Sequence, residues 1–328
     1  MHHYDSLEAM GADCATAPYL AIGTFDGLHR GHLAVLAALL RAGRLAAAPC
    51  AVLTFVPHPL SILSPQGAPL ALTTGAQRIR LLTALGLDAL VELPFDRTLA
   101  SLSPAEFVAE YLCRRARVHH AFVGADFTFG AGASGTAETL AVLGSQLCQL
   151  RVTTVPLVTA GGTPISSTRI RQVLRDGHPG LAARLLGRPF ALEGVVQPGD
   201  RRGATLGFPT ANVSLSSAVV WPAPGVYAAR VAVVDGPGGA DLQPGIANLG
   251  VRPTFGGATE PRLEAHIFDF QGDLYGKTVE VQFIRRLRGE RKFVGSAALR
   301  AQIARDAARA RRVLATPVCR ASEVWDIR

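Results

Sequence analysis

The stretch AIGTFDGLHRGHLAVLAALL, residues 21–40, joins an apolar segment to a helical pattern and places two histidines at the junction. Residues 18–25 predict a buried strand, and the leucines that follow recur at helical spacing. His29 and His32 lie three positions apart, so at the start of that helix both imidazoles share one face. Gly31 between them has no side chain and lets a ligand approach the backbone. Because a helix start offers free N–H groups and a positive dipole end, the stretch predicts a phosphate site.

The spacing of the two histidines excludes two familiar motifs. It is not the H-E-x-x-H of a zinc protease, and no Gly-Lys-Ser/Thr follows to make a P-loop. Two imidazole donors at a helix start would stabilise charge that develops on a phosphoryl oxygen, with no covalent intermediate. The plain alternative is a pair of surface histidines.

The first half of the chain alternates apolar strands with helical patterns. Its strands are nearly continuous apolar runs, which predicts a parallel sheet covered by helices on both faces. Ser103 and Glu106 form a capping box with Pro104 at the first helical position. The predicted strands are 18–25, 50–55, 88–95, 120–127 and 151–158, and the later helices are 75–85, 103–115, 137–150, 167–175 and 179–186.

After Gly187 the pattern changes to strands separated by turns. Six strand-like segments with Gly, Pro and Asp between them predict an antiparallel barrel or sandwich, followed by one helix over 296–313. The segments are 190–196, 206–215, 225–234, 242–250, 262–270 and 277–287. The sequence therefore predicts two domains, 1–187 and 188–328, with an irregular tail from 315 to the end.

Composition limits the class of protein. A chain of 328 residues favours two domains, and no run approaches the 18 consecutive apolar residues of a membrane helix. The first residues lack a secretory signal, so we expect a cytoplasmic protein and no membrane partner. Five scattered cysteines, odd in number and never in C-x-x-C, argue against a disulfide framework and a zinc site.

The net charge of +8 is modest and spread out. Residues 1–187 hold 14 basic and 12 acidic side chains, whereas residues 188–328 hold 19 and 13. We therefore expect phosphate-bearing small substrates and no nucleic acid. The charge leaves oligomeric state open.

A second phosphate motif, ISSTRIR, occupies residues 165–171 after the fifth strand. Ser166 or Ser167 is placed to cap the next helix, with Arg169 and Arg171 in its first turn. Arginines there oppose the helix dipole unless an anion is present. Hydroxyls and guanidinium groups at a helix start thus indicate a pyrophosphate clamp.

Together these motifs resemble the nucleotidyltransferase superfamily, and the FMN adenylyltransferase module of prokaryotic FAD synthetases in particular. The stretches GTFDGLHRGH, TFVPHP, LSPAEFV and VGADFTFGAGASGT carry the resemblance. It implies a Rossmann-like α/β domain in which the FMN phosphate attacks the α-phosphorus of ATP. The implied catalytic residues are His29, His32 and Arg169; the nucleotide-binding ones are Gly23, Thr24, Phe25, Asp26, Gly31, Ser166, Ser167, Thr168 and Arg171; the flavin-binding ones are Asp126 and Phe127. The turn GAGASG, residues 130–135, departs from the basic residues that many members carry there.

The second half carries the segment GDRRGATLGFPTANV, residues 199–213. Thr210 and Asn212 are two positions apart on a predicted strand, so both point to one face. A hydroxyl and an amide oxygen suit a hard cation beside phosphates. In RLEAHIFDF, alternation puts Glu264, His266 and Phe268 on one face of a strand.

These segments, with PGIANLGVRPTFGG, resemble riboflavin kinase, a six-stranded β-barrel that transfers the ATP γ-phosphate to riboflavin. The resemblance implies that Glu264 is the general base and that Thr210 and Asn212 hold Mg²⁺ through ATP. It further implies nucleotide contacts at Gly203 and Gly207 and flavin contacts at Arg252 and Phe270. Ala204 departs from the pattern, where the family has arginine.

The two resemblances cover residues 18–314 in the order of the prokaryotic bifunctional riboflavin kinase/FMN adenylyltransferases. They imply riboflavin, FMN and ATP as substrates, FAD as final product and Mg²⁺ as cofactor. Two alternatives stay open. Only one of the activities is live, or the chain is a flavin- or nucleotide-binding regulator without turnover.

Overall fold

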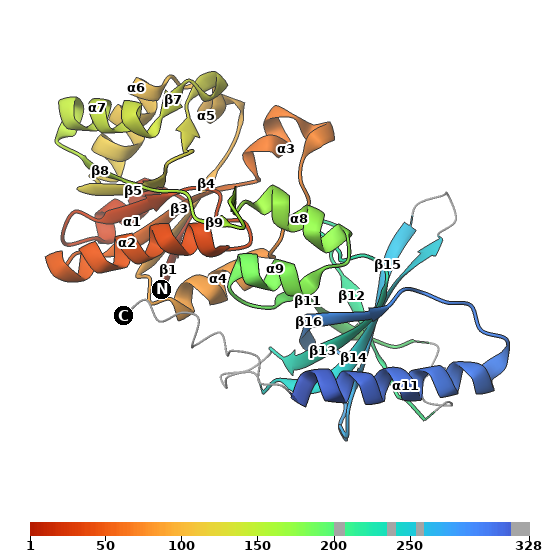
Figure 1. The fold of residues 1–328 in the computed structure, drawn as a ribbon. Helices are drawn as coiled ribbons and strands as arrows, with labels where there is room; N and C mark the ends of the chain where they lie inside the picture. The colour runs from red at the N-terminus through yellow and green to blue at the C-terminus, as the bar shows by residue number, and fades with distance from the viewer. Residues whose placement is uncertain (200–206, 235–240, 254–258, 316–328) are drawn as a thin grey trace. The chain divides into compact units, whose positions relative to one another are not determined.

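The computed structural model describes residues 1–199, 207–234, 241–253 and 259–315 and forms two compact units (Figure 1). Residues 1–70 and 75–166 make up the first unit. The second consists of residues 71–74 and of the described chain from Ser167 onward. Within the described ranges, no helix has both the length and the apolar character that a bilayer span requires.

A six-stranded parallel sheet forms the first unit, in the order β1-β4-β3-β2-β5-β8. All four residues of β2 are buried, as the apolar run predicted. The five predicted strands are confirmed, and His2–Tyr4 adds a sixth at the edge, paired with β4. The strands are β1 (His2–Tyr4), β2 (Tyr19–Ile22), β3 (Cys50–Val56), β4 (Ala89–Pro94), β5 (His120–Gly124) and β8 (Arg151–Val155).

Helices cover both faces of this sheet. Leu20 and Ile22 of β2 face a core that α1, η2 and α7 complete, whereas Ala21 between them faces the other way. On that other side, α2 packs against β2 and β5 (Figure 1). The helices are α1 (Leu7–Asp13), α2 (Arg30–Ala46), α3 (Pro59–Leu63), α4 (Gly75–Ala84), α5 (Arg97–Ser101), α6 (Pro104–Phe107), the π-helix η2 (Val108–Arg115) and α7 (Ala137–Cys148).

The capping box predicted at Ser103 is confirmed. The Ser103 backbone N–H donates to Glu106 Oε2 at 2.7 Å, and the Glu106 N–H donates to Ser103 Oγ at 3.3 Å. Beyond Phe107 the helix continues as η2, a π-helix that the 3.6-residue pattern did not predict. Short elements complete the unit: η1 (Pro65–Gly67), η3 (Ala131–Ala133), β6 (Thr128–Phe129), β7 (Gly135–Thr136), β9 (Thr159–Ala160) and β10 (Thr163–Pro164).

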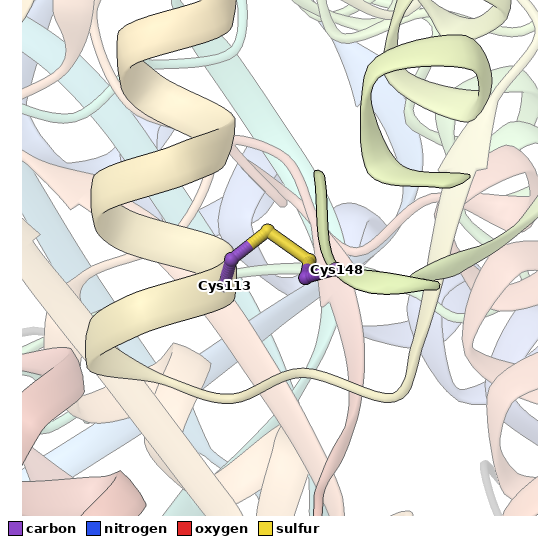
Figure 2. The surroundings of a disulfide bond; sticks show 2 residues. All are labelled: Cys113 and Cys148. Carbon is purple, nitrogen blue, oxygen red and sulfur yellow. A yellow bond between two sulfur atoms is a disulfide. The ribbon is translucent and has the colours of Figure 1, made fainter. Parts of the chain in front are cut away.

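A disulfide joins Cys113 of η2 to Cys148 at the end of α7, 35 residues later (Figure 2). The argument against a disulfide framework did not anticipate this single bridge. An odd cysteine count argues against a framework of several bridges, yet it allows one pair wherever two helices pack together. Cys50 stays a buried thiol, and burial, with the nearby Asp88 carboxylate, raises its pKa to about 11.

The second unit is built on a closed six-stranded barrel, in the order β11-β12-β15-β14-β13-β16, with all neighbours antiparallel. This confirms the barrel and its six predicted strands. Its core holds alternate residues such as Leu263, Ala265 and Val281, each nearly inaccessible to solvent. The strands are β11 (Phe190–Gln197), β12 (Ala211–Leu215), β13 (Gly225–Val233), β14 (Gln243–Pro253), β15 (Thr259–Ile267) and β16 (Thr278–Arg288).

The predicted C-terminal helix is α11 (Gly295–Ala315), which packs on the outside of the barrel over β13, β14 and β16. Ala310 and Leu314 contribute its buried face. Two ion pairs fix it: Arg288 Nε to Asp306 Oδ2 at 2.8 Å, and Arg311 to both carboxylate oxygens of Asp269. Hydrogen bonding to Arg311 lowers the pKa of the Asp269 carboxyl. The predicted irregular tail lies almost wholly outside the described residues.

Two further helices belong by their contacts to the second unit: α8 (Ser167–Arg175) and α9 (Pro179–Leu186). Both were predicted from the sequence. α9 contacts β16 and β11, and the Ala223 N–H donates to the Leu174 carbonyl of α8 at 3.0 Å. The grouping of contacts therefore divides the chain after Ser166, whereas the change of sequence pattern falls at Gly187. The cut at Gly187 stays a prediction about where the activities separate.

These contacts predict that a fragment of residues 167–328 is more stable than one of residues 188–328. The shorter fragment loses α8 and α9, and with α9 the buried Ala182, Leu185 and Leu186 of the helix that contacts β16 and β11. At about 1.5–3 kcal/mol for each fully buried leucine, we expect the shorter fragment to unfold at clearly lower urea concentration. Urea titrations followed by circular dichroism make the comparison. Equal midpoints would show that α9 adds nothing to the barrel.

Candidate active sites

The carboxyl end of β2 opens into a strained turn that leads to α2. Phe25, Gly27 and Leu28 have φ values of 47°, 80° and 43°, all in the left-handed region. Two hydrogen bonds tie the turn to β3, because the Gly23 N–H donates to Leu53 O at 3.1 Å and Thr54 Oγ1 donates to Thr24 O at 3.0 Å. Strain held in this way is typical of a turn that positions a functional group.

His29 caps α2 with its own side chain. Its Nδ1 accepts from the His32 backbone N–H at 3.3 Å, and the side chain is almost fully buried. A nitrogen that accepts carries no proton, so the neutral ring carries its proton on Nε2. The cap thereby fixes the tautomer of the neutral ring, with the proton on Nε2.

The rings of His29 and His32 are stacked, with centroids 3.6 Å apart and planes 16° from parallel. Phe25 packs edge-on against His32 at 5.3 Å. Two imidazolium ions at this separation would repel by about 5 kcal/mol at an effective dielectric constant of about 20. This repulsion disfavours a state in which both rings are charged.

The structure gives a packing reason for glycine at position 31, where the sequence suggested an approach for a ligand. A Cβ at this position would lie 3.0 Å from His29 Cε1 and 3.1 Å from His29 Nδ1. The space is filled by the imidazole of His29 itself, which folds back over the helix start. Gly31 therefore allows the capping geometry, and its expected contact with the nucleotide stays a prediction.

The neighbouring strand β5 ends beside β2, and Asp126 and Phe127 follow it directly. From β2 the sheet grows toward β3 and β4 on one side and toward β5 and β8 on the other. The carboxyl ends of β2 and β5 therefore form the topological switch point where α/β sheets bind ligands. Asp126 is exposed, and Phe127 stacks on Phe129 at 5.5 Å. Asp26 is buried in the turn after β2. The structure thus brings the predicted residues of the two strands to one edge of the sheet.

The ISSTRIR segment forms the helix start that was predicted. α8 begins at Ser167, so Ser166 occupies the capping position and Thr168 and Arg169 the first turn. Arg171 is buried, with an exposed fraction of 6%. The grouping of contacts divides this segment after Ser166, and its placement as a clamp on the nucleotide stays a prediction.

In the second unit, β12 and β15 bring the predicted kinase residues together. Asn212 and Glu264 are opposite each other in the antiparallel register. Glu264 and His266 are half-buried, whereas the alternate residues Leu263 and Ala265 are buried inside the barrel. This confirms the predicted alternation. These functional side chains therefore lie on the outer face of the barrel.

That outer face and α11 enclose a cavity of about 390 Å³, hereafter the Glu264 cavity. Its size falls within the range of about 300–1,000 Å³ that small-molecule sites occupy. The lining combines aromatic, aliphatic and charged groups, among them Phe208, Thr210, Asn212, Arg262, Glu264, His266, Arg288, Phe293, Leu299 and Asp306.

Arg262 links the two predicted catalytic groups. Its Nη2 lies 2.8 Å from Glu264 Oε1 and donates to Asn212 Oδ1 at 3.2 Å. One guanidinium thus orients both the carboxylate and the amide oxygen on the same face of the barrel. Arg262 precedes Glu264 by two positions, so strand alternation alone would place both side chains on one face.

His266 holds the segment that carries Thr210. Its Nδ1–H donates to the Pro209 carbonyl at 2.7 Å, and Phe208 packs edge-on against the imidazole at 5.5 Å. The contact fixes the chain just before β12. Thr210 then borders the Glu264 cavity and also a smaller one of about 170 Å³, the Thr210 cavity.

The other predicted kinase residues have varied outcomes. Phe270 lines the Thr210 cavity together with Tyr275, and not the Glu264 cavity. Gly207 has a φ of 83° and lies in an exposed turn. Gly203 and Ala204 lie outside the described residues, as does the side chain of Arg252, whose backbone belongs to β14.

Gly199 is a site residue that sequence reasoning missed. A Cβ there would lie 2.0 Å from Asn212 Nδ2 and 2.5 Å from its Cγ. The Asn212 amide is packed directly on the Gly199 backbone, so the absence of a side chain at position 199 sets where the amide lies. Only the three-dimensional approach of β11 to β12 reveals this contact.

Comparison with known proteins assigns a family to each half of the chain. The FAD synthetase family model matches residues 12–169, and the riboflavin kinase family model matches residues 186–314. The bifunctional riboflavin kinase/FMN adenylyltransferase of Escherichia coli K12 is 42% identical over 89% of this chain and 91% of its own length. The protein of the same description from Bacillus subtilis is 36% identical over 88% of this chain and 89% of its own length.

A solved structure has the same fold over nearly the full length. It is described as a macrolide-efflux protein from Streptococcus pneumoniae and superposes with a TM-score of 0.81 at 32% identity. The match covers 96% of this chain and 99% of that chain. From the two family models and the relatives that match along most of their length, the chain belongs to the bifunctional riboflavin kinase/FMN adenylyltransferases, the enzymes that make FMN from riboflavin and FAD from FMN.

Proposed function

We propose that the two activities divide between the two sites described above, with adenylyl transfer at the carboxyl ends of β2 and β5 and phosphorylation at the Glu264 cavity. The single observation that carries the kinase assignment is the register that sets Asn212 opposite Glu264 beside a cavity of ligand size. The adenylyl-transfer assignment is supported by the imidazole pair at the start of α2.

Phosphorylation needs a base beside the attacking hydroxyl. We assign that role to Glu264, which would take the proton from the terminal ribityl hydroxyl as its oxygen attacks the γ-phosphorus of ATP. Arg262 positions the carboxylate through their ion pair. Thr210 borders both cavities, so phosphates held in the Thr210 cavity would meet a hydroxyl held in the Glu264 cavity. Bringing the two reactants together in this way contributes much of the rate.

Mg²⁺ fits the donor set at this point. Asn212 Oδ1 already faces a cationic guanidinium, and an amide oxygen and a hydroxyl are hard ligands of the kind Mg²⁺ takes. Thr210 and Asn212 would hold the ion, with ATP phosphates completing its shell. Among the described residues, no group of three or more His, Cys, Asp or Glu side chains could bind a metal ion unaided. When bound, Mg²⁺ supplies neutralisation of phosphate charge.

For adenylyl transfer, the FMN phosphate oxygen attacks the α-phosphorus of ATP and pyrophosphate leaves. His29 Nε2–H and His32 donate to the phosphoryl oxygens on which charge grows, a role for fixed donors in a site shielded from water. We assign the pyrophosphate to Ser166, Ser167, Arg169 and Arg171, and the flavin to Asp126 and Phe127. The cytoplasm remains the expected location.

The experiment that tests the whole proposal follows products over time. Riboflavin, ATP and Mg²⁺ are added to the pure protein, and FMN and FAD are separated by liquid chromatography. We expect FMN to rise first and FAD to follow. Tight flavin binding without either product would support the regulator alternative, and accumulation of FMN alone would show that only one activity is live.

We predict that His29→Asn lowers FAD formation from supplied FMN by about 10²-fold, the usual loss when one oxyanion-type donor is removed. Asparagine is a good helix cap, so α2 should keep its stability while Nε2–H is lost. Steady-state assays of FAD formation measure the effect. FMN formation from riboflavin by the same variant is the control and should not change. Normal FAD formation would remove His29 from the mechanism.

We predict that Glu264→Gln lowers FMN formation by about 10²–10⁴-fold, because glutamine keeps the shape but cannot accept the proton. Glu290→Gln is the matched control, since Glu290 lines the same cavity from the segment after β16. It should stay within a few-fold of the unaltered enzyme. Parallel assays from riboflavin and from FMN decide the matter, and an equal loss in both would contradict a role confined to the kinase.

We predict that Gly199→Ala weakens phosphorylation through Asn212. The new methyl group occupies the place of the Asn212 amide, so the amide must rotate away from Thr210 and Arg262. We expect a higher KM for ATP–Mg²⁺ together with a lower kcat. Gly180→Ala is the control, because its nearest neighbour is 4.0 Å away. Kinetics of FMN formation over a range of ATP concentrations measure both constants, and an unchanged KM would show that Asn212 does not contact the nucleotide.

A further inference from the structure

The second unit has a third concavity, distinct from the two cavities of the kinase site. It has a volume of about 1,020 Å³ and lies where the start of α9, the end of β16 and the end of α11 meet, hereafter the arginine groove. None of its lining residues borders the Glu264 or the Thr210 cavity. Its lining is Gly177, His178, Pro179, Gly180, Leu181, Arg184, Ile284, Arg285, Arg286, Arg309, Arg312 and Val313.

The charged side chains that line the arginine groove are all positive. Five arginines line it, and no Asp or Glu is among the lining residues. Guanidinium groups remain charged at any pH a cell reaches, so this charge cannot be relieved by losing protons. Gathering five cations on one concave surface is unfavourable in the absence of an anion, because like charges repel one another.

Three arginines elsewhere in this unit have acidic partners. Arg288 pairs with Asp306, Arg262 with Glu264, and Arg311 with Asp269. Arg311 and Arg312 are adjacent on α11, yet only Arg312 lines the groove. The groove is therefore not simply the result of a basic composition, since acidic side chains are available in the same unit and are used at other positions.

The guanidinium groups of the groove retain most of their donors. Arg286 donates one N–H to Pro224 O at 2.7 Å, and Arg309 donates one to Leu287 O at 3.0 Å. Arg286 also hydrogen-bonds Tyr227 and its Nε is buried, so Arg309 keeps more N–H donors for a ligand than Arg286 does. Within the described ranges, the guanidinium groups of Arg184, Arg285 and Arg312 make neither an ion pair nor a hydrogen bond.

We propose that the arginine groove binds an oligophosphate, either a free chain of two or more phosphates or the phosphate tail of a nucleotide. A guanidinium matches two phosphate oxygens at once, and several forks on one surface suit a compact ligand with several negative charges. Gly180 leaves the backbone in the first turn of α9 uncovered, since the nearest atom to a Cβ there would be 4.0 Å away, and this lets a bulky anion approach. The assignment stands apart from the kinase and adenylyl-transfer sites, because it uses none of their residues.

Isothermal titration of the full-length protein in about 0.15 M salt tests the proposal, with tripolyphosphate, ATP and orthophosphate as probes. The test variant is Arg184→Gln/Arg285→Gln/Arg312→Gln, which removes three charges that hold no described partner. Arg300→Gln is the matched control, an exposed arginine of α11 outside the groove. Both active sites also bind phosphates, so the groove is read as the binding that the triple variant loses relative to the unaltered protein.

We expect the triple variant to lose one tripolyphosphate site, with affinity there falling at least about 100-fold, since each charged hydrogen bond removed costs about tenfold or more. FMN and FAD formation by this variant should equal that of the unaltered protein, which also shows that it folds. Loss of an ATP site as well identifies nucleotide tails as ligands, whereas loss with tripolyphosphate alone identifies free chains.

Three results would overturn the proposal. The first is identical tripolyphosphate binding by the triple variant and the unaltered protein, and the second is an equal loss in Arg300→Gln. The third is orthophosphate binding in the groove as tightly as tripolyphosphate, which would make it a surface for any anion. A single-stranded RNA oligonucleotide that binds there while tripolyphosphate does not would likewise replace this ligand class with nucleic acid.

Discussion

The first unit depends on one buried strand that has parallel neighbours on both sides. Every residue of β2 is shielded from solvent, so its backbone donors and acceptors must pair with β3 and β5. Parallel pairing brings the ends of all three strands to one edge, and the next residues of the chain therefore emerge where ligands of such sheets bind. The left-handed turn and the capping histidine follow from the need to reverse direction there and start α2 within seven residues.

The second unit pairs its strands in a closed barrel whose interior is filled by side chains. Since alternate residues of β15 face opposite sides, the strand that supplies core leucine and alanine also supplies arginine, glutamate and histidine to the outside. α11 then turns that outer face into a cavity. Two ion pairs, at Asp306 in the middle of the helix and at Arg311 near its end, hold it in place, and Asp306 is itself part of the cavity wall.

Much of the secondary structure could be predicted from local sequence patterns a few residues long. The apolar runs gave the strands of both units, and alternation around Glu264 gave its face correctly. What escaped prediction depends on contacts between distant segments: β1 at the sheet edge, the π-helix η2, the Cys113–Cys148 pair and the packing of Asn212 on Gly199. Burial of Arg171 belongs to the same class, because a local sequence does not say what surrounds a side chain.

The contact between Gly31 and the imidazole of His29 changes how tolerance to substitution should be read in this family. A survey of all single replacements would find position 31 as intolerant as the histidines on either side, and a substrate contact would be the natural explanation. Here the intolerance would come from self-packing, since any side chain displaces the ring that caps the helix. Selection at the glycine therefore preserves the histidine's orientation, and the two positions should change together or not at all.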